Sequence, residues 1–213
     1  MLKKILIAVA VILVGFLAFA ATRPDTYRVE RTKDIAAPAE AAYAQIADFR
    51  AWEQWSPWEK LDPQMQKNHE GAPGTVGASY SWQGNDDVGK GKMTFTELES
   101  PKHVAIKLEF IEPFASVATT HFRVEPKGAD ATQVTWSMEG ENNFMGKVFS
   151  IFMDMDSMIG ADFEKGLAEL DTASQGAAKK MAEVRAAAQA EAAKQKVAAE
   201  AAAAAAAQAQ PAP

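Results

Sequence analysis

Residues 103–112 read HVAIKLEFIE, and apolar and polar side chains alternate along most of this stretch. Positions 104, 106, 108 and 110 carry Val, Ile, Leu and Phe, whereas positions 107 and 109 carry Lys and Glu. A period of two is typical of a strand with one buried face, because successive side chains point to opposite sides of a sheet. The stretch therefore predicts a strand with one apolar face and one polar face.

The same period recurs on both sides of this stretch. Short turns separate the segments, such as GAPGTVG at 71–77 and NDD at 85–87. Successive short strands joined by short turns predict an antiparallel meander that is apolar on one face. The other predicted strands span residues 27–35, 65–70, 78–84, 90–100, 117–125 and 133–139.

Two helices are predicted around these strands. A short one begins near Pro38, and Ala42, Tyr43 and Ile46 follow its period. A long one spans Phe144–Leu170, where large apolar side chains recur at helical spacing. An apolar sheet face has to be covered, and this helix is the evident cover. The order of elements predicts an α+β domain over residues 25–171, a curved antiparallel β-sheet wrapped around a long C-terminal α-helix.

The segment before this domain, residues 1–22, has the character of a membrane segment. Lys3 and Lys4 precede an apolar run over residues 5–21, which is just long enough to cross a bilayer. Ala18-Phe19-Ala20 fits the cleavage rule of a signal peptide, whereas the length of the run favours a retained transmembrane anchor. In both cases the lysines predict that the following domain is extracytoplasmic, periplasmic in a bacterial cell, and a cleaved form would be secreted.

The segment after the domain, residues 172–213, is dominated by alanine with scattered charged residues. Both are good helix formers, but large apolar side chains are nearly absent, so the segment cannot bury a core face. We expect a solvated helical tail that frays into QAQPAP. A spacer and a docking segment for a protein partner both fit this composition.

Composition and motifs exclude several classes of function. The chain has no cysteine, which excludes disulfides, thiolate metal sites and a cysteine nucleophile. Its net charge is −6, whereas nucleic-acid-binding domains are typically basic, so the sequence does not indicate a nucleic-acid binder. His69, His103 and His121 are not spaced like metal ligands, so we expect surface histidines, no metal site and no cofactor. Glu97 and Glu139 would approach the apolar face only if a bulge shifted the register.

Three segments carry a resemblance to a known family. They are VERTKDIAAPAEAAYAQIADFRAWEQWSPW at 29–58, GTVGASYSWQGNDDVGKGKMTFTE at 74–97 and MIGADFEKGLAEL at 158–170. With the order of elements, they resemble the SRPBCC superfamily, the START and polyketide-cyclase-like helix-grip proteins. The membrane segment is similar to a bacterial membrane-anchored branch. The label covers cyclases, hydrolases and lipid carriers, so the resemblance implies a fold more than an activity.

The resemblance implies a cavity between sheet and long helix that holds a hydrophobic ligand, although the same residues could form a solid core. Trp52, Trp55 and Trp58 follow the first helix, where they would anchor short helices to the sheet or line the cavity mouth. The predicted cavity residues are Tyr80, Trp82, Phe95, Leu108, Phe110, Phe122, Trp136, Met138, Phe149, Phe152 and Trp55.

Three hypotheses follow. The first is a membrane-anchored domain that binds a hydrophobic small molecule or lipid without chemistry, since no convergent catalytic residues are visible. The second is a cyclase-like or hydrolase-like enzyme for an apolar or aromatic substrate, which requires an acid, base or hydroxyl group inside the cavity. The third is an interaction module of the cell envelope that docks a partner through the Ala-rich tail.

Overall fold

A seven-stranded antiparallel sheet forms the centre of the structure, a computed structural model that describes residues 1–152 and 154–208, with side chains to residue 202. The strand order is β1-β7-β6-β5-β4-β3-β2, so the meander predicted from the alternating segments is confirmed. Its strands are β1 (Thr26–Ile35), β2 (Gln66–Glu70), β3 (Ser79–Gln83), β4 (Lys90–Glu99), β5 (His103–Glu112), β6 (Ser116–Pro126) and β7 (Thr132–Glu141).

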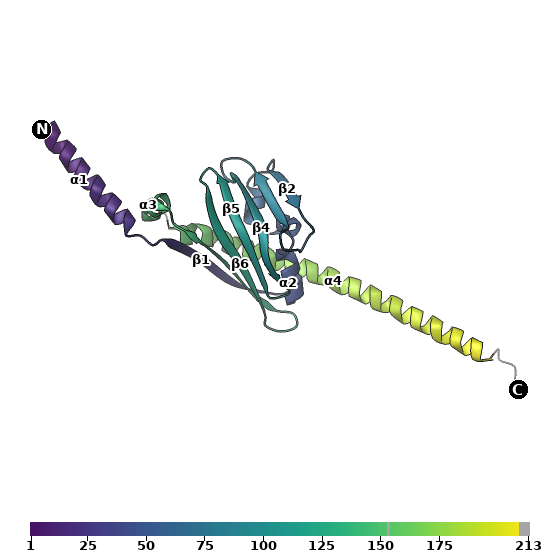
Figure 1. The fold of residues 1–213 in the computed structure, drawn as a ribbon. Coiled ribbons are helices and arrows are strands. Elements are labelled where there is room, and N and C mark those ends of the chain that lie inside the picture. Colours follow the sequence, from purple (N-terminus) through teal and green to yellow (C-terminus); the bar gives the residue numbers. More distant parts are fainter. Residues whose placement is uncertain (153, 209–213) are drawn as a thin grey trace.

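Helices occupy one face of this sheet and both ends of the described chain (Figure 1). Two of these helices begin at a proline. Pro38 is the N-cap residue of α2, and Pro57 is the first residue of η2, where its fixed φ suits a first turn. The α-helices are α1 (Leu2–Ala21), α2 (Ala39–Ile46), α3 (Phe144–Phe152) and α4 (Met155–Gln208), and the short 3₁₀ helices are η1 (Phe49–Gln54) and η2 (Pro57–Lys60).

The first turns of α4 cover the inner face of the sheet. Phe163, Leu167 and Leu170 are buried there at helical spacing, and the ring of Phe163 stacks on Trp136 of β7 at a centroid distance of 4.0 Å. Gly166 lets the helix come this close, because a Cβ at this position would lie 2.8 Å from Cζ3 of Trp136. The α+β helix-grip fold is therefore confirmed.

The prediction of one continuous helix over Phe144–Leu170 is wrong. α3 ends at Phe152 and α4 begins at Met155, where the carboxylate of Asp154 accepts hydrogen bonds from the backbone N–H of Asp156 and the hydroxyl of Ser157. Such a side-chain cap starts a new helix. α3 leaves the sheet and contacts α1 instead.

The Ala-rich tail is helical, as predicted, but it is the continuation of α4 and not a separate element. The helix passes the expected domain boundary at residue 171 without a break, and residues as far as Ala178 still pack on the core. The division of the chain there stays a prediction. The expected fraying concerns residues 208–213, and 209–213 lie outside the described residues.

α1 is long and apolar enough to cross a membrane, with a mean hydropathy of 2.7. Nearly all of its side chains are exposed, unlike those of a core helix of similar composition. α1 and the free end of α4 leave the sheet in opposite directions (Figure 1). The domain therefore lies between an apolar helix and a solvated one.

Candidate functional site

A pocket of about 290 Å³ opens between the inner face of the sheet, η2 and the first turns of α4. Its size lies at the lower end of small-molecule sites, and its wall is mostly aromatic and aliphatic, as such sites usually are. The pocket is lined by Trp52, Ser56, Trp58, Glu59, Met65, Tyr80, Trp82, Asp87, Val88, Met93, Leu108, Phe110, Thr120, Trp136, Met138, Ile159, Asp162 and Phe163.

The structure brings together some of the residues expected in the cavity and separates the others. Phe95, Phe122 and Trp55 are fully buried core residues that do not line the pocket. Phe149 and Phe152 lie on α3, are exposed, and contact Phe114 and Phe16, because the helix break carries them away from the sheet. The expected residues that do line the pocket are Tyr80, Trp82, Leu108, Phe110, Trp136 and Met138.

The three clustered tryptophans divide between core and pocket. The indole N–H groups of Trp52 and Trp55 donate to the backbone carbonyls of Ile46 and Gln45 at 2.9 and 3.0 Å, which fixes η1 to the end of α2. Trp58 is half-buried, packs edge-on against Trp136, and lines the pocket. Trp55 is thus a core anchor and Trp58 a pocket residue, while Trp52 is both buried in the core and part of the pocket wall.

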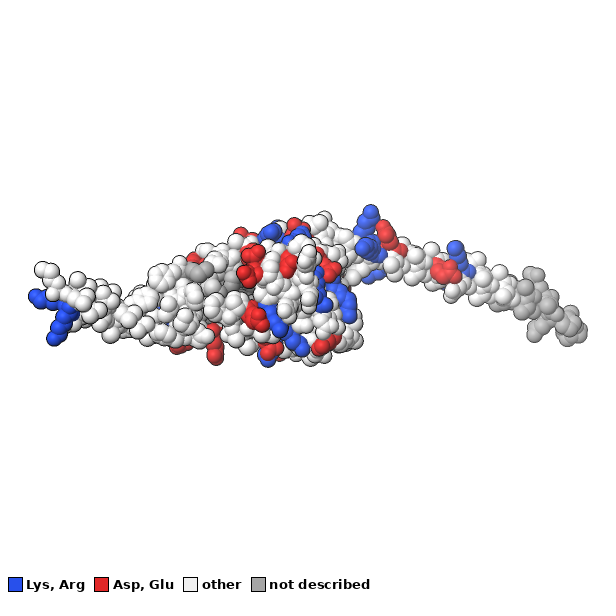
Figure 2. All heavy atoms as spheres, turned by 90° about the horizontal axis from the view of Figure 1, so that it is seen from above, with Lys and Arg blue, Asp and Glu red and all other residues white. Residues whose placement is uncertain are grey.

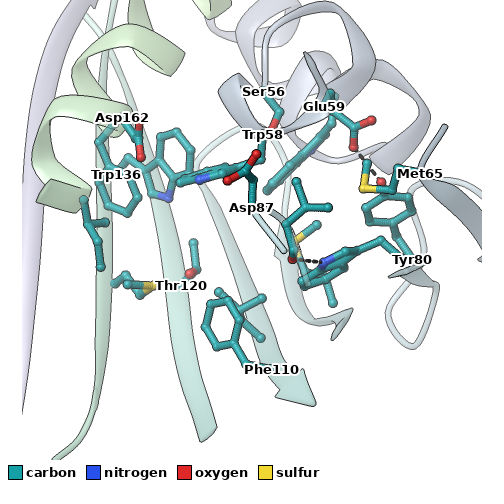
Figure 3. Close-up of a pocket in the computed structure, with 18 residues that line it drawn as sticks. Ser56, Trp58, Glu59, Met65, Tyr80, Asp87, Phe110, Thr120, Trp136 and Asp162 are labelled. Carbon is teal, nitrogen blue, oxygen red and sulfur yellow. Dashed lines mark hydrogen bonds between the residues drawn. The ribbon is translucent and has the colours of Figure 1, made fainter. Parts of the chain in front are cut away.

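Polar groups interrupt the apolar wall on one side of the pocket. Trp136 is 2% exposed, and its indole N–H has no hydrogen-bond partner among the described residues. The buried hydroxyl of Thr120 and the carboxylate of Asp162 belong to the same side (Figure 3). An unpaired buried donor costs free energy, which an acceptor brought within its reach would recover.

A second polar group lies on the opposite side of the pocket (Figure 3). The hydroxyl of Tyr80 donates to Oε1 of Glu59 at 2.7 Å, and Oε2 of Glu59 is paired with the ammonium group of Lys67. Burial, followed by the hydrogen bond to Glu59, raises the pKa of Tyr80 well above its usual range. Tyr80 therefore remains a protonated donor at neutral pH, and both oxygens of Glu59 are engaged.

The alternation of the strands could not indicate Glu59, Asp87 and Asp162, because these carboxylates come from η2, a turn and α4. The sequence predicts Glu97 and Glu139 near the apolar face only if a bulge shifts the register. β4 does contain a register shift after Phe95, but the Glu97 side chain is 69% exposed. Glu139 pairs with Arg28 and lies away from the pocket.

The outer face of the sheet brings two histidines together. Nε2 of His103 lies 3.2 Å from Nδ1 of His121, and the rings are stacked. Burial, then the neighbouring His103, lowers the pKa of His121. Across residues 1–152 and 154–208, no group of three or more His, Asp or Glu side chains is placed to hold a metal ion. His69 is partly buried and lies against the ring of Tyr80.

A family model described as polyketide cyclase/dehydrase and lipid transport matches residues 26–175, most of the chain. The chain belongs to this family. The matched residues contain all seven strands, both 3₁₀ helices and the part of α4 that covers the sheet. A comparison with curated proteins found no match.

Solved structures show the same fold for this polyketide cyclase-family domain at low sequence identity. Protein Mll3558 of Rhizobium loti is 14% identical with a TM-score of 0.52, covering 70% of this chain and 96% of its own. The Aha1 dimer of Colwellia psychrerythraea is 17% identical with a TM-score of 0.50, covering 69% and 95%. Such likeness supports the fold and leaves the ligand to be argued from the pocket.

Proposed function

We propose that the chain is a membrane-anchored binding domain that holds a hydrophobic small molecule or lipid in the pocket between the sheet and α4. The observation that carries this proposal is an open pocket of about 290 Å³ whose wall is mostly apolar. Met65, Met93 and Met138 contribute flexible thioether side chains to that wall, which suit ligands of varied shape. The family description, which includes lipid transport, supports the same class of ligand.

The polar side of the pocket refines the class to an amphipathic molecule with a hydrogen-bond acceptor. The N–H of Trp136 is buried without a partner among the described residues, and a ligand carbonyl or carboxyl oxygen would reach it through a small shift of the neighbouring side chains; the hydroxyl of Thr120 lies in the same wall. A pure hydrocarbon has no acceptor for this buried donor, so it lacks this contribution to the free energy of binding. The ligand is therefore expected to place its acceptor beside Trp136 and its apolar part along Leu108 and Phe110.

Two neighbouring positions on β5 provide a matched test of binding. Leu108 lines the pocket, whereas Lys107 is exposed on the other face. We expect Leu108→Trp to fill the pocket and abolish displacement of a fluorescent fatty acid, and Lys107→Trp to leave displacement unchanged. Native mass spectrometry of the chain after exposure to lipid extracts would identify the bound species. Equal displacement by both variants would exclude this pocket as the site.

Replacement of Trp136 by Phe tests the acceptor. The change removes the N–H and keeps an aromatic ring, so affinity for a fatty acid should fall about two- to tenfold, the equivalent of a net hydrogen bond of about 0.5–1.5 kcal/mol. Affinity for an apolar probe of similar size without an acceptor should not fall. Equal losses for both probes would show that Trp136 contributes packing alone.

An enzyme of the cyclase or hydrolase class is the second candidate, because the pocket wall is not entirely apolar. Asp162 lies in the wall and forms no ion pair within the described part of the chain, unlike Glu59. Asp87 also lines the pocket without an ion pair among the described residues but is exposed, so we propose the partly buried Asp162 for a proton-transfer step. Asp162→Asn should leave ligand binding intact, and loss of turnover of a bound polyketide-like substrate in that variant would establish catalysis.

The anchor and its topology complete the proposal. Lys3 and Lys4 before the span favour a cytoplasmic amino end and an extracytoplasmic domain. The absence of cysteine makes a single Ala129→Cys substitution in the exposed turn after β6 a clean probe. A membrane-impermeant maleimide should label it in intact cells with a permeable outer membrane. Protection until lysis would place the domain in the cytoplasm, and the mass of the isolated chain would show whether residues 1–20 are retained.

A further inference from the structure

An exposed apolar surface lies beside the end of α1. We call it the apolar platform and define it as α3 together with Ile111 at the end of β5, Phe114 of the β5–β6 connection and Val117 at the start of β6. None of the nine residues of α3 is buried. Phe152, Phe114 and Met145 are 73%, 70% and 57% exposed. An apolar surface of this kind on a water-soluble domain usually marks an interaction site.

The parts of the platform contact one another and the membrane segment. The rings of Phe114 and Phe149 lie 6.0 Å apart, which joins the β5–β6 connection to α3. The rings of Phe152 and Phe16 lie 5.9 Å apart, which joins α3 to α1. The guanidinium of Arg23, just after the span, donates to the hydroxyl of Ser150 on α3. Figure 1 shows α3 at the end of α1 where the chain enters the sheet.

These contacts fix the depth of α3 relative to the span. Phe16 lies five residues before the last residue of α1, so Phe152 sits roughly 8 Å along the helix from its end, at about 1.5 Å per residue. Amphipathic helices in the membrane interface bury their apolar face by about 5–10 Å. α3 contains one charged residue, Lys147, and charged side chains are sparse beside α1 in Figure 2. The position and composition of α3 therefore match a helix at the lipid surface.

The strand register places a partly exposed part of the pocket wall at the same end of the sheet. Thr26 pairs with Glu141 at the end where α1 enters, and the antiparallel ladder carries this end across to Phe110, which pairs with Gly91. Phe110 lines the pocket together with Val88 of the turn before β4. Both are partly exposed, whereas Trp136 at the inner wall is buried.

We propose that the apolar platform rests in the surface of the bilayer that holds α1, so that the pocket opens toward the lipid and exchanges its ligand with the membrane. This inference rests on the proposed anchor and ligand class. It adds a second membrane contact that fixes the orientation of the domain. α4 leaves the domain in the opposite direction, so its free end extends away from the membrane (Figure 1).

Single spin labels in the full chain, reconstituted in vesicles of phosphatidylcholine and phosphatidylglycerol, test the proposal. The chain has no cysteine, so Phe149→Cys, Phe114→Cys, Val9→Cys and Ala129→Cys each give one labelled position. All four side chains are exposed, so labelling should not disturb the fold. We expect the ratio of oxygen to nickel-complex accessibility to be several-fold higher at 149, 114 and 9 than at 129.

The positions separate two kinds of failure. A lipid-protected label at position 9 with water-exposed labels at 149 and 114 would overturn the platform and leave the anchor intact. A water-exposed label at position 9 would overturn the anchor and the platform together. Unfolding curves of the four labelled chains should coincide with that of the unlabelled chain, which confirms that the accessibilities describe the folded domain.

Discussion

Gly166 and Gly176 lie on the same helix and provide a matched test of how α4 packs against the pocket. A Cβ on Gly166 would lie 2.8 Å from Cζ3 of Trp136 and 3.1 Å from Cδ of Pro57. A Cβ on Gly176 would meet nothing within 4 Å. Alanine is the better helix former at both positions, by about 1 kcal/mol. The two Gly→Ala changes therefore differ in packing alone.

The ring of Trp136 cannot move away freely, since it stacks on Phe163 and meets the rings of Trp58 and Phe122. Overpacking of such a site costs about 1–3 kcal/mol. After the gain in helix propensity, Gly166→Ala should destabilise the domain by roughly 0–2 kcal/mol, whereas Gly176→Ala should stabilise it by up to about 1 kcal/mol. The difference between the variants, about 1–3 kcal/mol, isolates the packing contribution.

Urea unfolding of the full chain in detergent solution, followed by tryptophan fluorescence, measures both values, because all five tryptophans lie in the domain. Fatty-acid affinity should fall with Gly166→Ala, since the change displaces the donor at Trp136, and should be unchanged with Gly176→Ala. Equal stabilisation by the two substitutions would refute the close packing of α4 on Trp136.

Two further predictions concern the core and the outer face. Trp55→Ala should lower the free energy of unfolding by about 3–5 kcal/mol, because the side chain is fully buried. Trp58→Ala should lower the free energy of unfolding less and ligand affinity more, because Trp58 lines the pocket. Similar stability losses in the two variants would contradict the assignment of Trp55 to the core and Trp58 to the pocket. The pKa of His121 is lowered in the folded domain, so the unfolded chain binds the proton more readily, and stability should fall as pH decreases below about 6.5. Unfolding midpoints across this range should be flatter for His121→Gln, and an unchanged pH dependence would show that other groups cause it.

The sheet could be predicted from the sequence because its signal is local. One apolar face imposes a period of two on each strand, and Val104, Ile106 and Phe122 show it without knowledge of their partners. The contact between His103 and His121 could not be predicted in this way. It depends on the register between β5 and β6, which neither strand specifies alone.

The pocket was predicted in part for the same reason. Leu108, Phe110 and Met138 follow from strand alternation. Glu59 and Asp162 reach the pocket from helices whose orientation depends on the assembled domain. The spacing of apolar residues does not indicate the helix break, because the same helical spacing continues on both sides of it. Asp154, with Ser157 three residues later, is the local capping signal that could have revealed it.

That break also bears on the pocket. A continuous helix over Phe144–Leu170 would have kept Phe149 and Phe152 on the helix that covers the sheet, as the sequence predicts. α4 begins only at Met155, and the first of its residues that lines the pocket is Ile159. The side chains of Phe149 and Phe152 contact the β5–β6 connection and α1 instead. One capped interruption therefore removes two aromatic side chains from the helix that covers the sheet and supplies the apolar platform, so we expect the pocket and the platform to depend on the same break.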